Sequence, residues 1–509
     1  MIAQLVREKT LKGGRLFGFA LIIVALVFLL LPTGTVHANG NTYTVTNTND
    51  SGTGSLRQAI LNANANTPVR DTVDFSPSLG PGTVITLTGS DLVITDDLDI
   101  MGPDGYEMIV SGNNNNRVFT IDEGINVSIT RLNINNGIAY EGGGIDVDEG
   151  GSLELNYCIV ENNTTDGGAY GGTGGGIYID IGGSLTIDHC IIRNNSTDDG
   201  NDEGGYGAGI FCFEAVVSIT NSTIHDNHCG DATDDNTQGD AWGGDGGGIA
   251  SIRSSITLIN CTISGNSAGD AMNAAVVGLG GHGGGIYNFQ GQVYLNNCTV
   301  VENSAGYGAI VDGYGGGIYD MLDTTIFAKN SIIAENYAPG SGHDINGELR
   351  SYGCNMIGDR VGLYTLETSY PDDIAILGDI MLGPLGNNGG YTPTHALMPG
   401  SPAIDGVASG FCMTIGIGAP GATVTEDQRD IPRPQDGDDD GEALCDIGAY
   451  EYVYVPPPPP SQPPPSGDAV GGDVYPVNKV ALIVPWIALA AVILAGGIFL
   501  IRRRVHSYK

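Results

Sequence analysis

The sequence predicts an all-β protein: a right-handed parallel β-helix with an N-terminal capping helix and, after it, a C-terminal transmembrane helix. Three observations predict this fold. A Gly-Gly-Gly-Ile or Gly-Ala-Gly-Ile element recurs every 32 to 39 residues in the middle of the chain. An asparagine follows each element at an almost constant distance. The segments between them alternate apolar with polar residues and are rich in β-branched side chains, a pattern typical of strands.

Residues 1–38 are predicted to be a secretory signal peptide. Four basic residues (Arg7, Lys9, Lys12, Arg15) precede an apolar stretch from Leu16 to Leu31. Val36-His37-Ala38 then places small residues where a signal peptidase cleaves. An uncleaved membrane anchor is the alternative. In both cases the chain that follows lies outside the cytoplasm.

Residues 39–80 are predicted to cap the β-helix. Leu56, Ala59, Ile60 and Ala63 fall on one face of a short helix. The open end of a β-helix exposes unpaired strand edges, and a helix laid across it prevents association through them. We therefore interpret this segment as a structural cap rather than as a functional site.

Residues 81–380 are predicted to hold the repeats. The repeated isoleucine is followed by a small residue and, five residues later, by an asparagine. The three sets are Ile145, Ile177, Ile210, Ile249, Ile286 and Ile318; Cys158, Cys190, Ser222, Cys261, Cys298 and Ser331; and Asn163, Asn195, Asn227, Asn266, Asn303 and Asn336. Stacked coils give these units a continuous core, in which the asparagine amides bond from coil to coil. The right hand follows the general preference of parallel crossovers.

These motifs resemble known families. The Gly-Gly-Gly-Ile and Asn-Cys-Thr-Ile-Ser-Gly-Asn repeats are similar to those of polymorphic outer-membrane proteins, within a pectate-lyase-like solenoid. Residues 43–50 and 54–60 resemble the start of CSLREA-type β-helix proteins, although Ser55 and Gln58 replace the cysteine and glutamate of that motif. Residues 383–390, 393–397, 400–405, 427–429 and 445–451 resemble a choice-of-anchor Q domain. The resemblance implies a bacterial or archaeal surface-anchored β-helix in which residues 381–455 form a C-terminal cap.

The end of the chain is predicted to anchor the protein in a membrane. Residues 456–478 are rich in proline and favour an extended, semi-rigid stalk. Residues 479–509 contain a run of 22 apolar residues from Val480 to Ile501, followed by Arg502, Arg503 and Arg504. That length spans a bilayer as a helix, and the arginines belong on the cytoplasmic side. The sequence thus predicts a single-pass protein with its ectodomain on the cell surface.

The charge of the chain excludes one class of function. The chain has 58 acidic and 20 basic residues, for a formal net charge of −38. The two terminal segments hold nine of the basic residues and only one acidic residue, so the ectodomain is more acidic still. Such a surface repels phosphates, which excludes nucleic-acid binding. It favours solubility as a monomeric ectodomain and suits divalent cations.

Nine cysteines in an exported chain suggest disulfides. Cys158, Cys190, Cys261 and Cys298 belong to the repeated column, where parallel side chains one coil apart favour packed thiols. Cys412 and Cys445 bracket an irregular segment and are the pair most favoured for a disulfide. Cys212 with Cys229 is a weaker second candidate, which leaves Cys354 over.

An acidic loop near the C-terminus is a candidate calcium site. Asp436, Asp438 and Asp440 occupy positions one, three and five of a turn with Gly441 at position six, like the first half of a calcium loop. Ile447 stands where an EF-hand has glutamate, so Glu442 or Asp446 would complete the ligands. A solvated acidic turn is the alternative.

The loops that follow the repeated asparagines vary in length and emerge on one side. They carry aromatic and acidic residues, of which the candidate ligand-binding set is Tyr170, Tyr206, Asp240, Trp242, Asp245 and Tyr314. In solenoids, variable loops on one face often bind ligands. Aromatic rings stack on sugars and carboxylates accept hydroxyl hydrogen bonds, so a glycan surface is predicted; solvated loops without a ligand are the alternative.

The sequence therefore favours a non-catalytic surface protein that acts in adhesion or in glycan or envelope binding. The alternative is a calcium-dependent carbohydrate-active enzyme, a polysaccharide lyase or glycoside hydrolase. Catalysis needs paired carboxylates or a basic residue near a calcium site. Arg193, Arg253 and Lys329 are the only lysines and arginines between Ile145 and Asn336, and no motif groups them with carboxylates. We name no catalytic residue.

Overall fold

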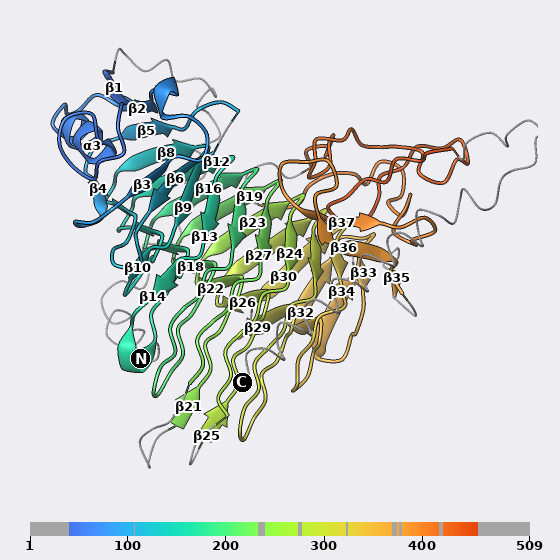
Figure 1. Cartoon of the computed structure of the whole chain (residues 1–509). Helices are drawn as coiled ribbons and strands as arrows, with labels where there is room; N and C mark the ends of the chain where they lie inside the picture. The colour runs from blue at the N-terminus through green and yellow to red at the C-terminus, as the bar shows by residue number, and fades with distance from the viewer. Residues whose placement is uncertain are drawn as a thin grey trace, which may run out of the picture. The chain divides into compact units, whose positions relative to one another are not determined.

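The computed structural model describes residues 40–105, 107–232, 240–272, 277–321, 324–368, 374–375, 379–416 and 421–456. The signal peptide, nearly all of the stalk and the transmembrane segment predicted above lie outside these residues. Within the described part of the chain, none of the helices combines the length and apolar character needed to cross a bilayer. The described chain is an all-β solenoid built from long parallel sheets (Figure 1).

Each coil of the solenoid contributes one strand to each of three parallel sheets, here numbered in the order in which a coil visits them. Sheet 1 holds β4 (Leu92–Ile94), β7 (Phe119–Ile121), β11 (Ile145–Val147), β15 (Ile177–Ile179), β18 (Ile210–Phe213), β22 (Ile249–Ile252), β26 (Ile286–Phe289) and β29 (Ile318–Met321). Sheet 2 holds β1 (Thr42–Val45), β2 (Asp71–Phe75), β5 (Leu98–Met101), β8 (Asn126–Thr130), β12 (Ser152–Asn156), β16 (Ser184–Asp188), β19 (Val216–Thr220), β23 (Ser255–Ile259), β27 (Gln292–Asn296), β30 (Thr325–Lys329), β32 (Ile345–Ser351) and β34 (Leu363–Thr368). Sheet 3 holds β3 (Val84–Thr86), β6 (Met108–Ser111), β9 (Leu132–Asn135), β13 (Ile159–Glu161), β17 (Ile191–Arg193), β20 (Thr223–His225), β24 (Thr262–Ser264), β28 (Thr299–Val301), β31 (Ile332–Ile333), β33 (Met356–Ile357) and β35 (Ile374–Ala375). β32 also pairs with β29 and thereby joins sheets 1 and 2.

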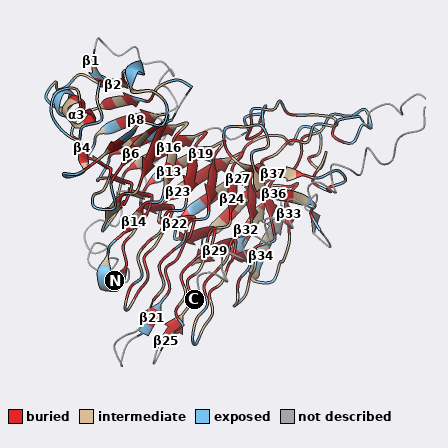
Figure 2. Cartoon of the chain, viewed as in Figure 1, coloured by how far each residue is buried: buried red, intermediate tan, exposed pale blue. Residues whose placement is uncertain are grey.

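The register of the sheets places the repeated residues on top of one another. Ile145 pairs with Ile177, and Ile177 pairs with Ile210. These isoleucines are fully buried, and in β16 the burial alternates between Leu185 and Ile187, which are buried, and Thr186, which is exposed. The core is therefore a column of aliphatic side chains inside the coils, drawn in red along the strands in Figure 2.

The predicted asparagine ladder is confirmed. The Oδ1 atom of Asn227 accepts hydrogen bonds from the backbone N–H and the side-chain Nδ2 of Asn195, both at 3.0 Å. Asn266 does the same for Asn227, at 3.1 and 2.9 Å. At the far end Asp344 takes the place of the next asparagine, and its Oδ1 atom accepts from the N–H and Nδ2 of Asn336 at 3.0 and 2.9 Å. Asp344 thus ends the ladder.

The ladder also explains why each repeat carries a glycine just before its isoleucine. A Cβ atom on Gly209 would lie 2.5 Å from the carbonyl oxygen of Gly248 and 3.2 Å from the amide carbon of Asn227. Gly176, Gly248 and Gly285 face the same neighbours in their own coils. Only glycine fits between one coil and the next at this point, so the glycine and asparagine motifs describe a single packed layer.

The N-terminal cap is confirmed as a helix, α3 (Leu56–Asn64). The Oγ atom of Ser55 accepts from the N–H of Gln58 at 3.1 Å, which caps the helix. Leu56, Ala59, Ile60 and Ala63 form its buried face, as the spacing predicts, and α3 contacts β1, β2 and β4. A short 3₁₀ helix, η1 (Pro77–Leu79), follows β2. Because β1 pairs with β2 and β2 with β5, the parallel array already begins at Thr42 rather than after residue 80.

The repeated cysteines are free, buried thiols, as expected. Three members of this column each accept a backbone hydrogen bond from the preceding coil. The N–H of Cys158 bonds to Sγ of Cys190 at 3.2 Å, the N–H of Cys190 bonds to Oγ of Ser222 at 3.0 Å, and the N–H of Cys298 bonds to Oγ of Ser331 at 3.1 Å. The second-choice disulfide between Cys212 and Cys229 is wrong. Both thiols are free, and they donate to different carbonyl groups, of Ala250 and of Asp245.

The C-terminal segment, residues 380–455, lies along the outer side of sheet 3 rather than across the end of the solenoid (orange to red in Figure 1). It contains one antiparallel pair, β36 (Leu382–Gly386) and β37 (Thr394–Leu397). Thr223 donates to the carbonyl of Pro393 at 2.6 Å, and Thr262 donates to Gln428 at 2.6 Å. This position differs from the predicted cap because the threonine and asparagine side chains on the outside of sheet 3 match the polar groups of the segment.

Candidate binding face and candidate metal site

The long loops between sheets 3 and 1 form a second stacked structure. Each loop leaves a ladder asparagine as an outgoing arm and comes back to the glycine motif as a returning arm. β21 (Asp240–Trp242) and β25 (Val277–Leu279) are paired returning strands at the loop ends (Figure 1), and β10 (Ile138–Ala139) pairs with β14 (Thr164–Thr165) nearer the solenoid. The outgoing arms are stacked through Ser196, His228, Ser267 and Ser304. We use the name fin for these stacked arms, without the strands of sheets 1 to 3, in the described residues from Thr164 to Gly315.

Glycine backbone holds the two layers of the fin together. The N–H of Gly244, on a returning arm, bonds to the carbonyl of Gly230 on an outgoing arm at 3.0 Å. The chain of bonds continues from Gly269 to Gly244 at 2.9 Å and from Gly281 to Gly269 at 2.8 Å. A Cβ atom on Gly269 would lie 1.9 Å from the carbonyl oxygen of Gly230. The layers therefore approach more closely than any side chain allows, and the loops are an ordered extension of the solenoid.

The returning arms place the predicted ligand-binding residues on one side of the fin. Tyr206, Asp245 and Tyr314 each stand four residues before a repeated isoleucine, so they occupy equivalent positions in their coils. Trp242 bridges to Glu203 of the preceding coil. Tyr170 ends the 3₁₀ helix η2 (Gly168–Tyr170) in an earlier coil, where the following Gly171 lies against Gly204 and Gly205. The structure thus brings the predicted set onto neighbouring returning arms.

These residues divide into exposed and buried members. Tyr170 is 51% exposed and Trp242 is 39% exposed, and Asp240 is exposed beside Trp242 in β21. Asp245 is only 9% exposed, and Tyr206 and Tyr314 are half-buried. The Tyr206 hydroxyl donates to Glu203. The exposed members are able to touch a ligand, and the buried members fix the face that carries them.

A row of stacked aromatic rings lies on the outer side of sheet 1, where Phe211 and Tyr287 are buried and Tyr178 and Tyr319 are half-buried. Tyr178 stacks on Phe211 with ring centroids 5.4 Å apart, and Tyr287 stacks on Tyr319 at 5.7 Å. The His282 ring stacks on Tyr319 at 4.4 Å and on Tyr314 at 5.4 Å, and its Nδ1 atom accepts from the N–H of Tyr314 at 2.9 Å. We call the returning arms together with the outer side of sheet 1 the binding face.

Burial shifts the pKa values of several groups on the binding face. Burial, and then the charge of Glu203, raises the pKa of Asp245 to about 8 against a hydrogen bond from the His282 N–H. Burial lowers the pKa of His282 to about 4. Burial raises the pKa of Asp146 to about 7, although Arg117 lies 2.7 Å away and opposes the shift. Asp146 and Asp245 therefore gain or lose protons near neutral pH.

A candidate metal site lies in the C-terminal segment. Asp405, Asp436 and Asp438 can each present a carboxylate oxygen such that the three atoms lie within 4.8 Å of one another. Asp405 also accepts hydrogen bonds from the N–H groups of Gly437 and Asp438, both at 2.9 Å. Asp440 and Glu442 are not part of this group, and Asp446 is buried with its two oxygens bonded to the N–H groups of Asp405 and Tyr452. Sequence reasoning missed Asp405 because it is 31 residues away from Asp436.

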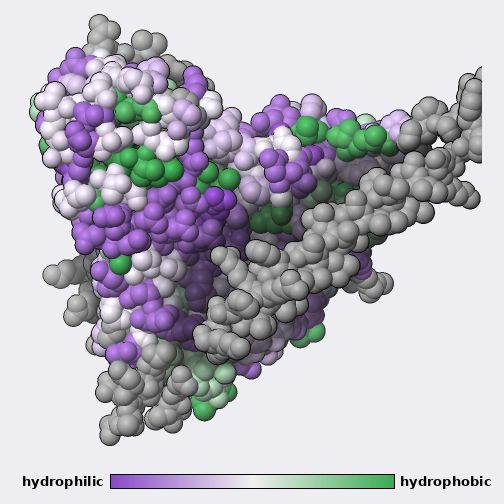
Figure 3. Space-filling view, viewed as in Figure 1, coloured by the Kyte–Doolittle hydropathy of each residue, from purple (hydrophilic) through white to green (hydrophobic). Residues whose placement is uncertain are grey.

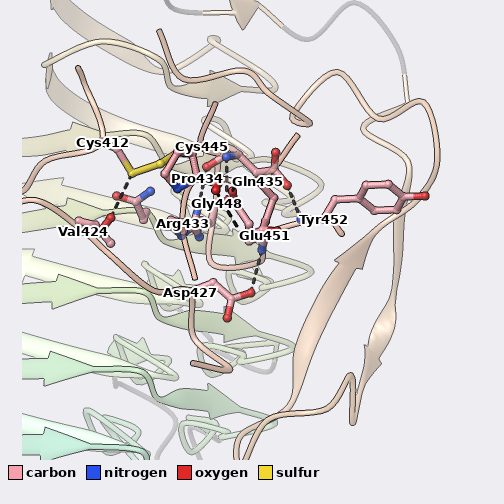
Figure 4. Close-up of polar contacts among 12 residues, drawn as sticks. Cys412, Val424, Asp427, Arg433, Pro434, Gln435, Cys445, Gly448, Glu451 and Tyr452 are labelled. Carbon is pink, nitrogen blue, oxygen red and sulfur yellow. Dashed lines mark hydrogen bonds and ion pairs between the residues drawn. A yellow bond between two sulfur atoms is a disulfide. The ribbon is translucent and has the colours of Figure 1, made fainter. Parts of the chain in front are cut away.

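The rest of the C-terminal segment is fixed by a disulfide and buried ion pairs (Figure 4). Cys412 and Cys445, the favoured pair, are joined by a disulfide. Arg433 and Glu451, both fully buried, form an ion pair of 2.8 Å, and Arg429 pairs with Asp427 at 2.6 Å. Burial, and then the charge of Glu451, raises the pKa of Asp446 to about 8. This network holds the acidic turn in place and leaves no exposed catalytic pair among these residues.

Basic residues of the repeats are engaged in local ion pairs. Arg193 lies 2.7 Å from Glu161, and Arg253 lies 2.8 Å from Glu214. His189 lies between Asp188 and Asp430, at 2.9 and 3.0 Å, and so joins the solenoid to the C-terminal segment. These pairs were invisible in the sequence because their partners come from adjacent coils or from the far end of the chain.

The surface of the described residues has two notable hollows. A groove of about 840 Å³ crosses the turns between sheets 1 and 2 and is lined by Glu214, Arg253 and Gln292 among others. A pocket of about 310 Å³ at the last coils is lined by Glu335, Asp344 and Asp359. Figure 3 shows a largely hydrophilic surface with small hydrophobic patches in one view. Neither hollow includes the exposed residues of the binding face.

The chain matches no protein-family model and no curated protein.

Proposed function

We propose that this protein is a non-catalytic, adhesin-like protein of the cell surface that binds glycans of other cells or of the envelope through its binding face. The observation that supports this most is the fin. Its backbone packing fixes Tyr170, Asp240 and Trp242 on an ordered surface, although these residues belong to loops that vary in length. Exposed aromatic rings and carboxylates on a rigid face are the groups that sugar rings and hydroxyls bind.

The fold class we propose in detail is a right-handed parallel β-helix that belongs with choice-of-anchor Q surface proteins. The stacked parallel sheets support this proposal, as does the packing of residues 380–455 against sheet 3. The motif residues Asp427, Arg429 and Glu451 all take part in the buried network of that segment. The proposal thus gives these sequence motifs a structural role.

The proposed placement has the solenoid outside, residues 456–478 as stalk and residues 479–509 as the membrane anchor. Protease added to intact cells should remove the solenoid and spare an epitope tag placed after Lys509. Protection of the solenoid in cells that lack an outer barrier would contradict the surface location.

Glycan binding is tested with the full chain, purified in detergent, on an array of glycans. We expect Trp242→Ala to weaken binding by at least about fivefold, because a central aromatic contact contributes more than 1 kcal/mol. Tyr391→Ala is the matched control, since Tyr391 is 47% exposed but lies in the C-terminal segment, outside the binding face. Binding that Trp242→Ala leaves unchanged would place the glycan site elsewhere.

We further propose that Asp405, Asp436 and Asp438 hold a calcium ion that stabilises the C-terminal segment. Carboxylate oxygens suit this cation, and binding to the folded state alone stabilises it by about 2.7 kcal/mol at 100 times the Kd. Chelation should lower the melting temperature of the wild type but not that of the triple alanine variant at these positions. Asp440→Ala is the matched control and should keep the calcium response.

The alternative function is a carbohydrate-active enzyme, and the pocket beside Glu335 is where it would act. Three carboxyl groups line this pocket. However, both oxygens of Asp344 are engaged, one with Asn336 and one with the N–H of Asp359. Release of reducing ends or unsaturated sugars from a polysaccharide, abolished by Glu335→Gln, would establish catalysis and overturn the non-catalytic proposal.

A further inference from the structure

The binding face carries a strong excess of negative charge. Its carboxyl groups include Glu141, Asp146, Asp148, Asp180, Glu203 and Asp240. Among the described residues of the face, the nearest cationic side chain is Arg117, which pairs with Asp146 at 2.7 Å and donates to the carbonyls of Glu141 and Gly142. His282 is neutral at physiological pH because burial lowers its pKa to about 4. Negative charge on this face is therefore not balanced within it.

The local charges already affect one another. Burial, and then the charge of Asp180, raises the pKa of Glu141. Burial, and then the charge of Asp122, raises the pKa of Asp148. Mutual repulsion of this kind is relieved when a cation arrives, whereas an anionic polymer would add to it. Charge complementarity thus excludes uronic-acid and sulfated glycans and favours a positively charged ligand.

Two exposed aromatic rings, Tyr170 and Trp242, flank Glu203, which is only 7% exposed. The exposed carboxylate beside Trp242 is Asp240. Trp242 and Tyr170 belong to coils on either side of the coil that carries Glu203, so they lie about two coil spacings, or about 10 Å, apart along the solenoid. An aromatic face attracts an ammonium group through its quadrupole and also stacks on a sugar ring. Tyr170, Glu203 and Trp242 therefore follow one another in successive coils along the solenoid axis.

We propose that the binding face selects glycans that carry free amino groups, with an ammonium group held by the exposed Asp240 and sugar rings stacked on Trp242 and Tyr170. This inference rests on the proposed glycan-binding function and names its ligand class. Binding of such a glycan makes and breaks no covalent bond. The selectivity comes from charge, so it weakens as salt screens the exposed carboxylates.

The test compares two oligosaccharides of equal length, one of β-linked glucosamine and one of β-linked N-acetylglucosamine, titrated into the full chain in detergent. We expect the free amine to bind at least tenfold more tightly, with a preference that falls between 50 mM and 500 mM salt. Equal binding of the two sugars would overturn the amine selectivity and leave glycan binding intact. Binding of neither these nor any arrayed glycan would contradict the proposed function itself.

Variants that remove one negative charge distinguish binding at a local site from attraction by the overall negative charge of the protein. Asp240→Asn should reduce the preference for the free amine about two- to fivefold, the range for an exposed ion pair. Asp270→Asn is the matched control on the outgoing side of the fin, where the carboxylate accepts from the N–H of Tyr307 at 2.7 Å. An equal loss with Asp270→Asn would show that net charge alone attracts the ligand, and the site would be wrong.

Discussion

The solenoid coils and the fin are made by the same stretches of chain, yet they are held together in different ways. In the coils, Ile145, Ile177 and Ile210 stack inside a core, and the asparagine ladder bonds each coil to the next. In the fin, glycine backbone packs on glycine backbone, and the buried side chains are as small as Ala232, Ala241 and Ala271. The coils and the fin therefore stack in the same register. Side-chain packing and the asparagine ladder stabilise the coils, whereas contacts between backbones stabilise the fin.

This difference shows that glycine serves two purposes in one sequence. Beside the ladder, a glycine such as Gly209 leaves room for an asparagine side chain of the same layer. In the fin, a glycine such as Gly269 leaves room for another backbone. The coils bury much apolar area and should resist unfolding, whereas the fin buries little and depends on the coils to align it.

The largest expected effect comes from removing one member of the ladder. Asn227→Leu leaves the N–H of Asn195 and the carbonyl of Ile192 without their partners inside the coil. A buried polar group without a partner costs about 1–3 kcal/mol, so the free energy of unfolding should fall by at least that amount. Denaturant unfolding of the full chain measures it. Asn62→Leu, on the exposed side of α3, is the control; equal stability of the two variants would mean that the ladder adds nothing.

Lowering the pH should destabilise the side of the solenoid that carries the binding face, because the buried His282 resists protonation in the folded state. The folded pKa of His282 is lowered to about 4 by burial, so its contribution to stability is complete above the unfolded pKa of about 6.5. It is lost as the pH falls towards 4, by up to about 3 kcal/mol. His282→Gln keeps an acceptor for the Tyr314 N–H and should lose less stability than the wild type between pH 7.5 and 4.5. A parallel loss in both proteins would contradict this assignment.

Raising the pH should weaken the attachment of the C-terminal segment to the solenoid, because His189 loses the proton that favours its contact with Asp430. Burial alone would lower the pKa of His189, but bonds and charges from Asp188 and then Asp430 outweigh it and raise the pKa above 6.5. This contribution is complete below pH 6.5 and is lost as the pH rises through the raised pKa. Protection factors for hydrogen exchange, which correct for the intrinsic rise of exchange rates with pH, should fall in residues 421–435 over that range in the wild type. In His189→Gln these protection factors should not change with pH.

The smallest effect on the coils is expected from a change in the fin. Gly269→Ala places a Cβ atom 1.9 Å from the Gly230 carbonyl, which the layers cannot accommodate. We expect local loss of protection from hydrogen exchange in residues 228–232 and 267–271, with a change of less than about 0.5 kcal/mol in global unfolding. Gly386→Ala, where the nearest atom to a Cβ would be 3.8 Å away, is the control. Global destabilisation as large as that of Asn227→Leu would show that the fin and the coils unfold together.

The coils could be predicted from sequence because their determinants are local and repeat. The offset of five residues between Cys190 and Asn195 recurs in all six repeats, and the register of sheet 3 keeps it. The helical spacing of Leu56, Ala59 and Ile60 likewise identified the cap. A parallel solenoid converts periodicity in the sequence into contacts between equivalent residues, so a pattern read along the chain already names the partners.

The position of the C-terminal segment, the metal site and the fin depend on contacts between residues that do not repeat at a regular spacing in the sequence. Gln428 bonds to Thr223 and Thr262, which are 205 and 166 residues away, so no spacing could place the C-terminal segment on sheet 3. Asp405 joins the acidic turn for the same reason. The sequence predicts that the loops vary in length and emerge on one side, but their packing into a fin depends on the alignment of loops of unequal length. Which loop aromatics are exposed, such as Trp242, and which are half-buried, such as Tyr206, followed only from that packing.

The way in which Asp344 ends the asparagine ladder has a consequence for how such a protein changes length. From Asn163 to Asn336, each ladder asparagine accepts hydrogen bonds from the coil before it and donates to the coil after it, and the Asp344 carboxylate closes the series. A duplicated or deleted coil would meet identical neighbours on both sides. The number of coils is therefore a property that recombination between repeats can adjust in single steps, with the distance between the two ends of the solenoid changing by about 4.8 Å each time.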